Sequence, residues 1–248
     1  MRALMYAAVL VIAGAPAAPT AAAQFPPDTL TNLKVFPQDI TPRQLIDVMR
    51  TFSFGLGVRC QFCHVGEEGQ PLSTFDFASD EKVTKRKARD MIEMVRAINE
   101  RHLSGLEERT DPAIEVGCET CHHGVAKPQR IQDVLAAEYP AGGADAVAAK
   151  YRALRAEYYG TAAYDFGEGT LPDLAGTLVG RPDVPAAIAV LQLNLEYFPA
   201  SSLTHFVLGE AHRAAGDTTA AVQSYEKALE LDADNRGARM RLQQLGRE

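Results

Sequence analysis

The chain has 248 residues, of which 46 % are hydrophobic, and it carries a formal net charge of −7. This length predicts one large or two small domains, and the hydrophobic content is sufficient to build packed cores. The acidic balance and the lack of Trp in the sequence argue against a nucleic-acid-binding protein and against a polybasic membrane-surface protein.

Residues 1–23 are typical of a secretory signal peptide. Arg2 supplies the positive charge, an apolar run extends from Ala3 to Gly14, and Ala21–Ala23 form a small-residue cleavage pattern before Gln24. The apolar run is too short to span a bilayer. We therefore expect an exported, periplasmic protein with no integral membrane span after signal cleavage, and an uncleaved anchor is the alternative.

Two amphipathic helices are predicted in the segment that follows. The first occupies about Thr41–Gly55, and Met49 lies in the middle of its apolar face. The second begins near Ser79, and it carries Met91 and Met94. Each helix is followed, after a connection, by one copy of a short cysteine motif.

That motif, Cys-x-x-Cys-His, occurs twice and uses every cysteine of the chain. The two copies consist of Cys60, Cys63 and His64, and of Cys118, Cys121 and His122. It is the attachment motif of c-type haem. Residues three and four apart share one side of a helical turn, so both thiols can bond the haem vinyl groups while the imidazole ligates the iron. The repeat predicts two covalently bound haem c groups.

A zinc site is the alternative interpretation of the cysteine pairs. Zinc requires four sulfur or nitrogen ligands that converge on one ion. We favour haem because His directly follows each pair and because the pattern is repeated. Export agrees with haem, since c-type haem is attached outside the cytoplasm in bacteria. With all four cysteines used in this way, no disulfide is expected.

Each haem iron accepts a second axial ligand, and the motif histidine supplies only the first. The candidates are Met49, Met91, Met94, His102 and His123. Methionine on an apolar helix face is often ordinary core packing, but here a Met-bearing helix precedes each motif. We interpret His102 as a surface or ligand-supporting residue, and His123 adjoins a motif histidine and cannot easily reach the same iron from the opposite side.

Two longer strings extend beyond the motifs. One is the run Met49–His64, which contains Gly57–Cys60, and the other is the run Arg89–Asn99 followed by Cys118–Gly124. On the basis of these two strings, the segment of about residues 30–130 resembles the cytochrome c subunit of photosynthetic reaction centres.

This resemblance implies the fold and the ligands of the haem region. In that family a helix before each motif supplies the axial ligand, usually methionine. The resemblance therefore implies Met49 at the first haem and Met91 at the second, with Met94 as the fallback. Photosynthetic members carry four haems where this chain has two motifs, so the resemblance implies a haem pair rather than a photosynthetic role.

The remainder of the chain is predicted to be helical. Residues 136–166 form a helical linker broken at Pro140 and Gly142-Gly143, and its aromatic end is expected to dock by its rings. Residues 167–248 resemble tetratricopeptide repeats, with Pro182–Phe198 as the second helix of one repeat and Arg236–Leu245 as a capping helix. From Ser202 the 34-residue pattern is matched by Leu208, Gly209, Gly216, Ala221, Tyr225 and Ala228.

The predicted fold class is mainly α. It combines a multihaem c-type cytochrome domain at residues 24–135, with little regular sheet, and a short helical tetratricopeptide solenoid. The expected function is transfer of single electrons between periplasmic donor and acceptor proteins, with the repeats docking a partner or packing. Two alternatives stay open: a haem enzyme of the dihaem peroxidase type with one open iron, and a docking module whose haems are structural or sensory.

Overall fold

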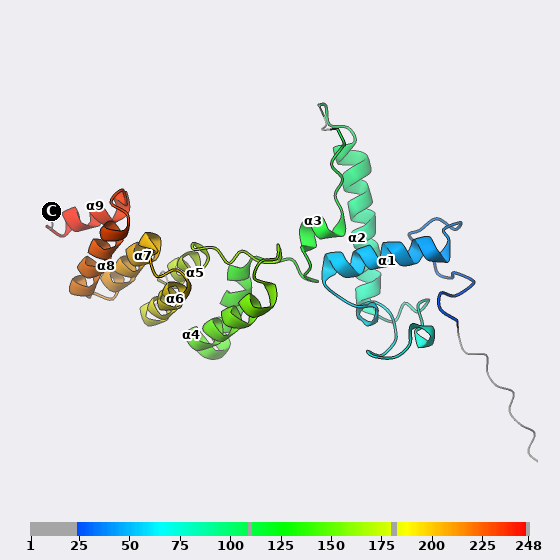
Figure 1. Cartoon of the computed structure of the whole chain (residues 1–248), viewed down its shortest axis with the longest axis horizontal. Helices are drawn as coiled ribbons and strands as arrows, with labels where there is room; N and C mark the ends of the chain where they lie inside the picture. Colours follow the sequence, from blue (N-terminus) through cyan, green and yellow to red (C-terminus); the bar gives the residue numbers. More distant parts are fainter. Residues whose placement is uncertain (1–23, 109–110, 180–182, 247–248) are drawn as a thin grey trace, which may run out of the picture. The chain divides into compact units, whose positions relative to one another are not determined.

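A computed structural model describes residues 24–108, 111–179 and 183–246 (Figure 1). The predicted signal peptide, residues 1–23, lies outside these ranges. The described chain is mainly helical, which confirms the predicted fold class, and it includes an isolated antiparallel bridge between Val65 and Asp76. It divides into two compact units, residues 24–49 with 59–96 and residues 50–58 with 97–246.

Helix α1 (Pro42–Leu56) lies within one residue of the predicted bounds at each end. Its start is stabilised by a reciprocal cap, in which the Gln44 amide donates to Thr41 Oγ1 at 3.3 Å and Gln44 Oε1 accepts from the Thr41 amide at 3.0 Å. At its end Gly57 adopts a φ of +63°, a left-handed conformation that stops the helix. Met49 lies half-buried in the third turn.

Helix α2 (Val83–Ala97) begins later than the sequence predicts. The expected start near Ser79 is wrong because the polar groups of that segment bind other residues. Asp80 accepts hydrogen bonds from Asn32 and Lys34, and the Ser79 carbonyl accepts one from Lys85. At its other end α2 widens into the π-helix η3 (Ile98–Leu103).

The two cysteine motifs form single turns. The first is the 3-10 turn η1 (Cys60–Phe62), and the second is the short helix α3 (Cys118–His122). Between the first motif and α2 the chain forms a further 3-10 turn, η2 (Leu72–Thr74).

The remaining helices are α4 (Ile131–Tyr158), α5 (Thr170–Val179), α6 (Val184–Tyr197), α7 (Ser202–Ala214), α8 (Thr218–Leu231) and α9 (Arg236–Gln244). Four of them begin at a side-chain cap, in which Asp183, Ser201, Asp217 or Asn235 accepts an amide proton three residues later. From α5 to α9, consecutive helices contact each other (Figure 1). The predicted break inside α4 is confirmed, since Gly142 and Gly143 have non-helical backbone angles.

The hydrophobic core of the second unit lies among helices α4–α7. Its fully buried members include Leu135, Tyr151, Leu171 and Leu191. Phe166, from the predicted linker, is buried in the same core, and the guanidinium of Arg155 lies 3.9 Å from the ring centroid of Tyr159. Phe166 therefore docks as predicted, whereas Tyr159 is 65 % exposed.

A smaller core joins α8 and α9 and contains Ala221, Tyr225 and Leu242. A Cβ on Gly209 of α7 would lie 2.3 Å from Cε1 of Tyr225, so this close helix approach requires glycine. The described helices have suitable lengths for tetratricopeptide repeats, and that assignment stays a prediction. In the described ranges no helix has the length and hydropathy to cross a membrane.

Candidate functional site

The first cysteine motif is closed into a turn by its own backbone. The amides of Cys63 and His64 both donate to the Cys60 carbonyl, at 3.2 and 2.9 Å. Both thiols are free and partly exposed, and burial raises the pKa of Cys63. Two accessible thiols on one turn are the groups to which the haem vinyl groups would be bonded.

The start of α2 binds this first turn from outside. The Lys82 ammonium donates to the Gln61 carbonyl, and the Thr84 hydroxyl donates to the Phe62 carbonyl at 2.5 Å. Both acceptors lie between the two cysteines. Residues 21 and 22 positions later in the sequence, at the start of α2, therefore fix two carbonyls of the turn.

His64 lies against the ring of Phe77, with a centroid distance of 4.9 Å and an edge-to-face angle of 64°. Burial, and after it the nearby Lys85, lowers the pKa of His64 to about 4. The imidazole is therefore neutral at pH 7, which is the form that ligates iron. Its Nδ1 is buried and has no hydrogen-bond partner of normal geometry.

The second turn positions its histidine more completely. Nδ1 of His122 lies 2.9 Å from the carbonyl of Val125, an arrangement that fixes the ring and leaves Nε2 for a ligand. His123 and Gly124 then reverse the chain with φ values of 50° and 84°. The Thr120 hydroxyl accepts from the Gly117 amide at 3.0 Å and stabilises the start of the turn.

The end of α1 packs directly on this second turn. The Gly124 amide donates to the Gly55 carbonyl at 2.9 Å. A Cβ on Gly57 would lie 2.0 Å from the Gly124 oxygen, and one on Gly55 would lie 3.3 Å from Cβ of Cys118. At Gly57 the approach leaves no room for a Cβ, whereas at Gly55 a Cβ would be tight and would require a small shift of the second turn. The sequence indicated these glycines only as a helix end.

Asn99 of η3 pins the segment that enters the second turn. Its amide nitrogen donates to the Val116 carbonyl at 2.9 Å, and its oxygen accepts from the Val116 amide at 2.8 Å. Sequence reasoning missed this role, although Asn99 closes the longer string that carries the family resemblance.

The candidate axial ligands lie on the helices where the sequence places them. Met49 is half-buried on α1, whereas Met91 and Met94 on α2 are 44 % and 46 % exposed. His102 and His123 are exposed. Met91 and Met94 belong to the first unit and His122 to the second, so the assignment of axial ligands stays a prediction.

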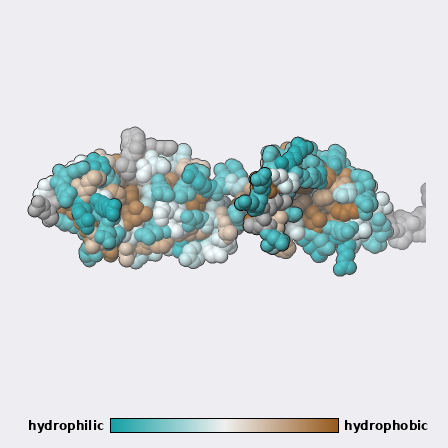
Figure 2. Space-filling view, turned by 90° about the horizontal axis from the view of Figure 1, so that it is seen from above, coloured by the Kyte–Doolittle hydropathy of each residue, from teal (hydrophilic) through white to brown (hydrophobic). Residues whose placement is uncertain are grey.

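The donor set and its surroundings fit a haem at each turn. In the ranges that the structure describes, no group of three or more His, Cys, Asp or Glu side chains is arranged to hold a bare metal ion. Figure 2 shows hydrophobic areas on the surface, and the exposed large apolar side chains include Phe54, Phe62, Met91 and Met94. A porphyrin is a large apolar plate that such side chains can contact.

Comparison with known proteins supports the same chemistry. Residues 43–142, less than half of the chain, match the model of a family described as photosynthetic reaction centre cytochrome C subunit. The matched segment contains both motifs, and the family implies covalently bound c-type haem. The search of curated proteins found no match.

Proposed function

We propose that this chain is an exported dihaem c-type cytochrome that passes single electrons between periplasmic partner proteins. The observation that carries the proposal is the pair of attachment turns, each of which presents two thiols and one neutral or hydrogen-bonded imidazole. A haem held at such a turn supplies one-electron redox chemistry at its iron.

The cysteines and the histidine of each turn would hold different parts of the haem. Cys60 and Cys63 would fix the porphyrin edge at the first turn, while His64 would bind iron from one side. At the second turn Cys118, Cys121 and His122 would do the same. Met49 and Met91, or Met94 in place of Met91, would close the opposite faces, and filled axial positions leave no open site for a substrate.

Haem content tests the proposal. The pyridine haemochrome of the purified, exported protein should give two haems per chain. Replacing Cys60 and Cys63 with Ala should remove one haem, and replacing Cys118 and Cys121 with Ala should remove the other. A protein with no covalent haem would contradict the proposal.

The ferric spectrum separates electron transfer from enzyme chemistry. Two low-spin irons that do not bind cyanide are expected of an electron carrier with both axial positions filled. A high-spin iron that binds peroxide or cyanide would instead favour the dihaem peroxidase alternative.

We further propose that helices α5–α9 dock a partner or pack as tetratricopeptide-like repeats. The core that begins at Ile131 continues through α4 into α7, so a deletion that starts inside it would expose buried side chains. Truncation after Arg130 avoids this. Unchanged electron transfer to the native partner by the truncated, haem-loaded form would argue against docking.

A further inference from the structure

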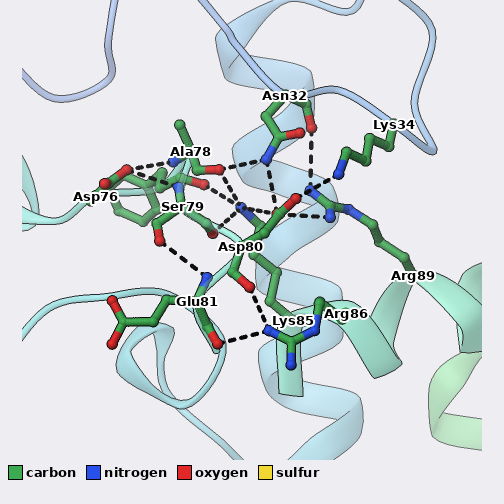
Figure 3. Close-up of polar contacts among 11 residues, drawn as sticks. Asn32, Lys34, Asp76, Ala78, Ser79, Asp80, Glu81, Lys85, Arg86 and Arg89 are labelled. Carbon is green, nitrogen blue, oxygen red and sulfur yellow. Dashed lines mark hydrogen bonds and ion pairs between the residues drawn. The ribbon is translucent and has the colours of Figure 1, made fainter. Parts of the chain in front are cut away.

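A charged cluster surrounds the loop that touches His64. Its centre is the carboxylate of Asp80, which accepts from Asn32 at 2.8 Å and from Lys34 at 2.6 Å and lies 2.8 Å from Arg89 (Figure 3). Lys34, in particular, comes from a segment 46 residues earlier in the sequence. These contacts hold the pKa of Asp80 well below its usual range, with Lys34 as the largest cause.

Lys85 is the buried cation of this cluster, and only 9 % of the residue is exposed. Its ammonium donates to the carbonyls of Phe77, Ala78 and Ser79, at 2.8, 3.1 and 2.7 Å. It also lies 3.4 Å from Asp80 (Figure 3). Three backbone acceptors use all three N–H donors of an ammonium, so the geometry requires the charged form.

The three carbonyls belong to one short loop, and its first residue contacts the motif histidine. Phe77 places its ring edge-to-face on His64. The same loop is tied to the residue after His64, because the Asp76 amide donates to the Val65 carbonyl at 2.9 Å. Lys85 therefore restrains the loop on which the His64 ring rests.

The charges of the cluster do not cancel. Lys34, Lys85 and Arg89 surround the carboxylate of Asp80. Asp76 is a second carboxylate that acts on Lys85, so three cations face two anions and one positive charge remains. A ferrous haem carries one positive charge less than a ferric haem, so a buried cation near the iron ligand favours the reduced form. The field of an exposed cation is weakened by water and salt, but Lys85 and Arg89 have side chains only 11 % and 12 % exposed.

We propose that Lys85 is a positioning residue for His64, and that its cluster with Asp80 raises the reduction potential of a haem held at the first turn. This inference rests on the proposed function, since it concerns the same first turn. The second turn contains Glu119 instead of a cation. Burial is the largest cause that raises the pKa of Cys118, and the charge of Glu119 is the second. The potential of a second haem, held by a turn of the other unit, is measured beside that of the first as a comparison.

Substitutions of opposite charge test the proposal by potentiometric titration. Lys85→Met should lower the midpoint potential of the first haem, and Asp80→Asn should raise it, although both remove contacts and should lower stability. Lys85→Arg should stay closer to the native potential than Lys85→Met. The first haem is assigned with the Cys118→Ala/Cys121→Ala protein, which retains only that haem.

Lys87→Gln is the matched control, because Lys87 is an exposed cation on the same helix. It should leave the first potential nearly unchanged. Hydrogen exchange supplies a readout that does not depend on haem, since Lys85→Met should speed exchange at residues 76–80. If Lys85→Met does not load haem, Lys34→Gln tests the charge effect, because this 58 % exposed cation can be removed without opening a buried site; a smaller fall in potential is expected.

Three results would overturn the proposal. The first is a shift of the same sign for Lys85→Met and Asp80→Asn, and the second is an equal shift for Lys87→Gln and Lys85→Met. The third is an unchanged first potential in every variant of the cluster. A native protein without two haems would instead contradict the proposed function, before any variant is made.

Discussion

The side-chain amide of Asn99 pairs with the backbone of Val116 on both sides, donating to its carbonyl at 2.9 Å and accepting from its amide at 2.8 Å. Val116 stands two residues before Cys118. A residue of η3, just after the end of α2, thereby sets the position from which the second attachment turn begins.

Asn99→Ala should loosen the entry to the second turn. The substitution leaves both backbone groups of Val116 without this partner, at a cost of about 1–3 kcal/mol. Because Val116 is half-buried, water can replace part of the loss, and we expect the lower end of this range. Urea unfolding measures the free energy, and hydrogen exchange at residues 114–118 localises it.

Asn99→Asp is the finer variant, because it keeps the acceptor for the Val116 amide and loses the donor to the carbonyl. Its free energy of unfolding should lie between those of the native protein and Asn99→Ala. Unchanged exchange at Val116 in both variants would show that this pair does not restrain the turn.

Gly57→Ala should destabilise the contact between α1 and the second turn. A Cβ at Gly57 would lie 2.0 Å from the Gly124 oxygen, and the φ of +63° is itself unfavourable for alanine. Gly69 has a φ of +81° with nothing within 4 Å of a Cβ. Gly69→Ala should therefore cost only the backbone strain of about 1–2 kcal/mol.

Gly57→Ala should cost about 1–3 kcal/mol more than Gly69→Ala, because backbone must move as well. Denaturant unfolding of both variants measures the difference. Haem content should fall at the second turn in the Gly57 variant alone. Equal destabilisation of the two variants would mean that the close approach to Gly124 does not exist.

Features that depend on residues acting on their own backbone could be predicted from the sequence. Features that depend on contacts between residues far apart in the sequence could not. The start of α1 follows from Thr41 and Pro42, and the break in α4 from its paired glycines, because these residues act on their own backbone. The start of α2 was misplaced because Asp80 binds Lys34, 46 residues away, instead of capping the helix. The spacing of residue types along the sequence does not reveal a contact between residues so far apart.

The candidate site divides in the same way. The attachment turns follow directly from the five-residue motif, whose spacing is a local property. The residues that support them, Lys85 at the first turn and Asn99 at the second, act on loops 6–8 and 17 residues away. Their periodicity places both on helices, and only the folded structure identifies what their side chains contact.

Met91→Ala tests the assignment of the second axial ligand. Thioether ligation raises the reduction potential relative to histidine ligation, so its loss should lower the potential of the second haem and open the iron to cyanide. Met49→Ala should do the same at the first haem. Met240 of α9 is 49 % exposed, and Met240→Ala is the control that should change neither spectrum.

Met94→Ala distinguishes the two candidates on α2. If it changes the ferric spectrum while Met91→Ala does not, Met94 is the ligand. Native spectra in the variants of Met49, Met91 and Met94 would contradict methionine ligation altogether.

Gly209→Ala and Gly176→Ala should have effects of opposite sign on the stability of the C-terminal helices. Both glycines lie inside helices, where alanine gains up to about 1 kcal/mol of helix propensity. Nothing lies within 4 Å of a Cβ at Gly176, so this variant should be stabilised. A Cβ at Gly209 would meet the buried ring of Tyr225 at 2.3 Å, and overpacking should cost about 1–3 kcal/mol. Thermal unfolding by circular dichroism compares them, and stabilisation of both would contradict the close packing of α7 on α8.

Glu210 should make the stability of the C-terminal helices depend on acid. It accepts from Tyr225 at 2.5 Å and forms a two-pronged pair with Arg241 at 2.8 and 3.0 Å. Burial alone would raise the pKa of Glu210, but hydrogen bonds from Tyr225, Arg213 and Arg241 outweigh it and the pKa is lowered.

A carboxyl with a lowered folded-state pKa stabilises the fold above its unfolded pKa, and this contribution is lost as the pH falls through the folded value. The native protein should therefore lose protection from hydrogen exchange at residues 202–245 as the pH falls below the ordinary Glu range, about 4.3. Glu210→Gln should be less stable at pH 7 and should lose most of this pH dependence. Glu196→Gln makes the same chemical change at an exposed pair with Arg152, where about 0–1 kcal/mol is at stake, and it should follow the native curve. A Glu210→Gln protein with the native acid dependence would assign that dependence to other carboxylates.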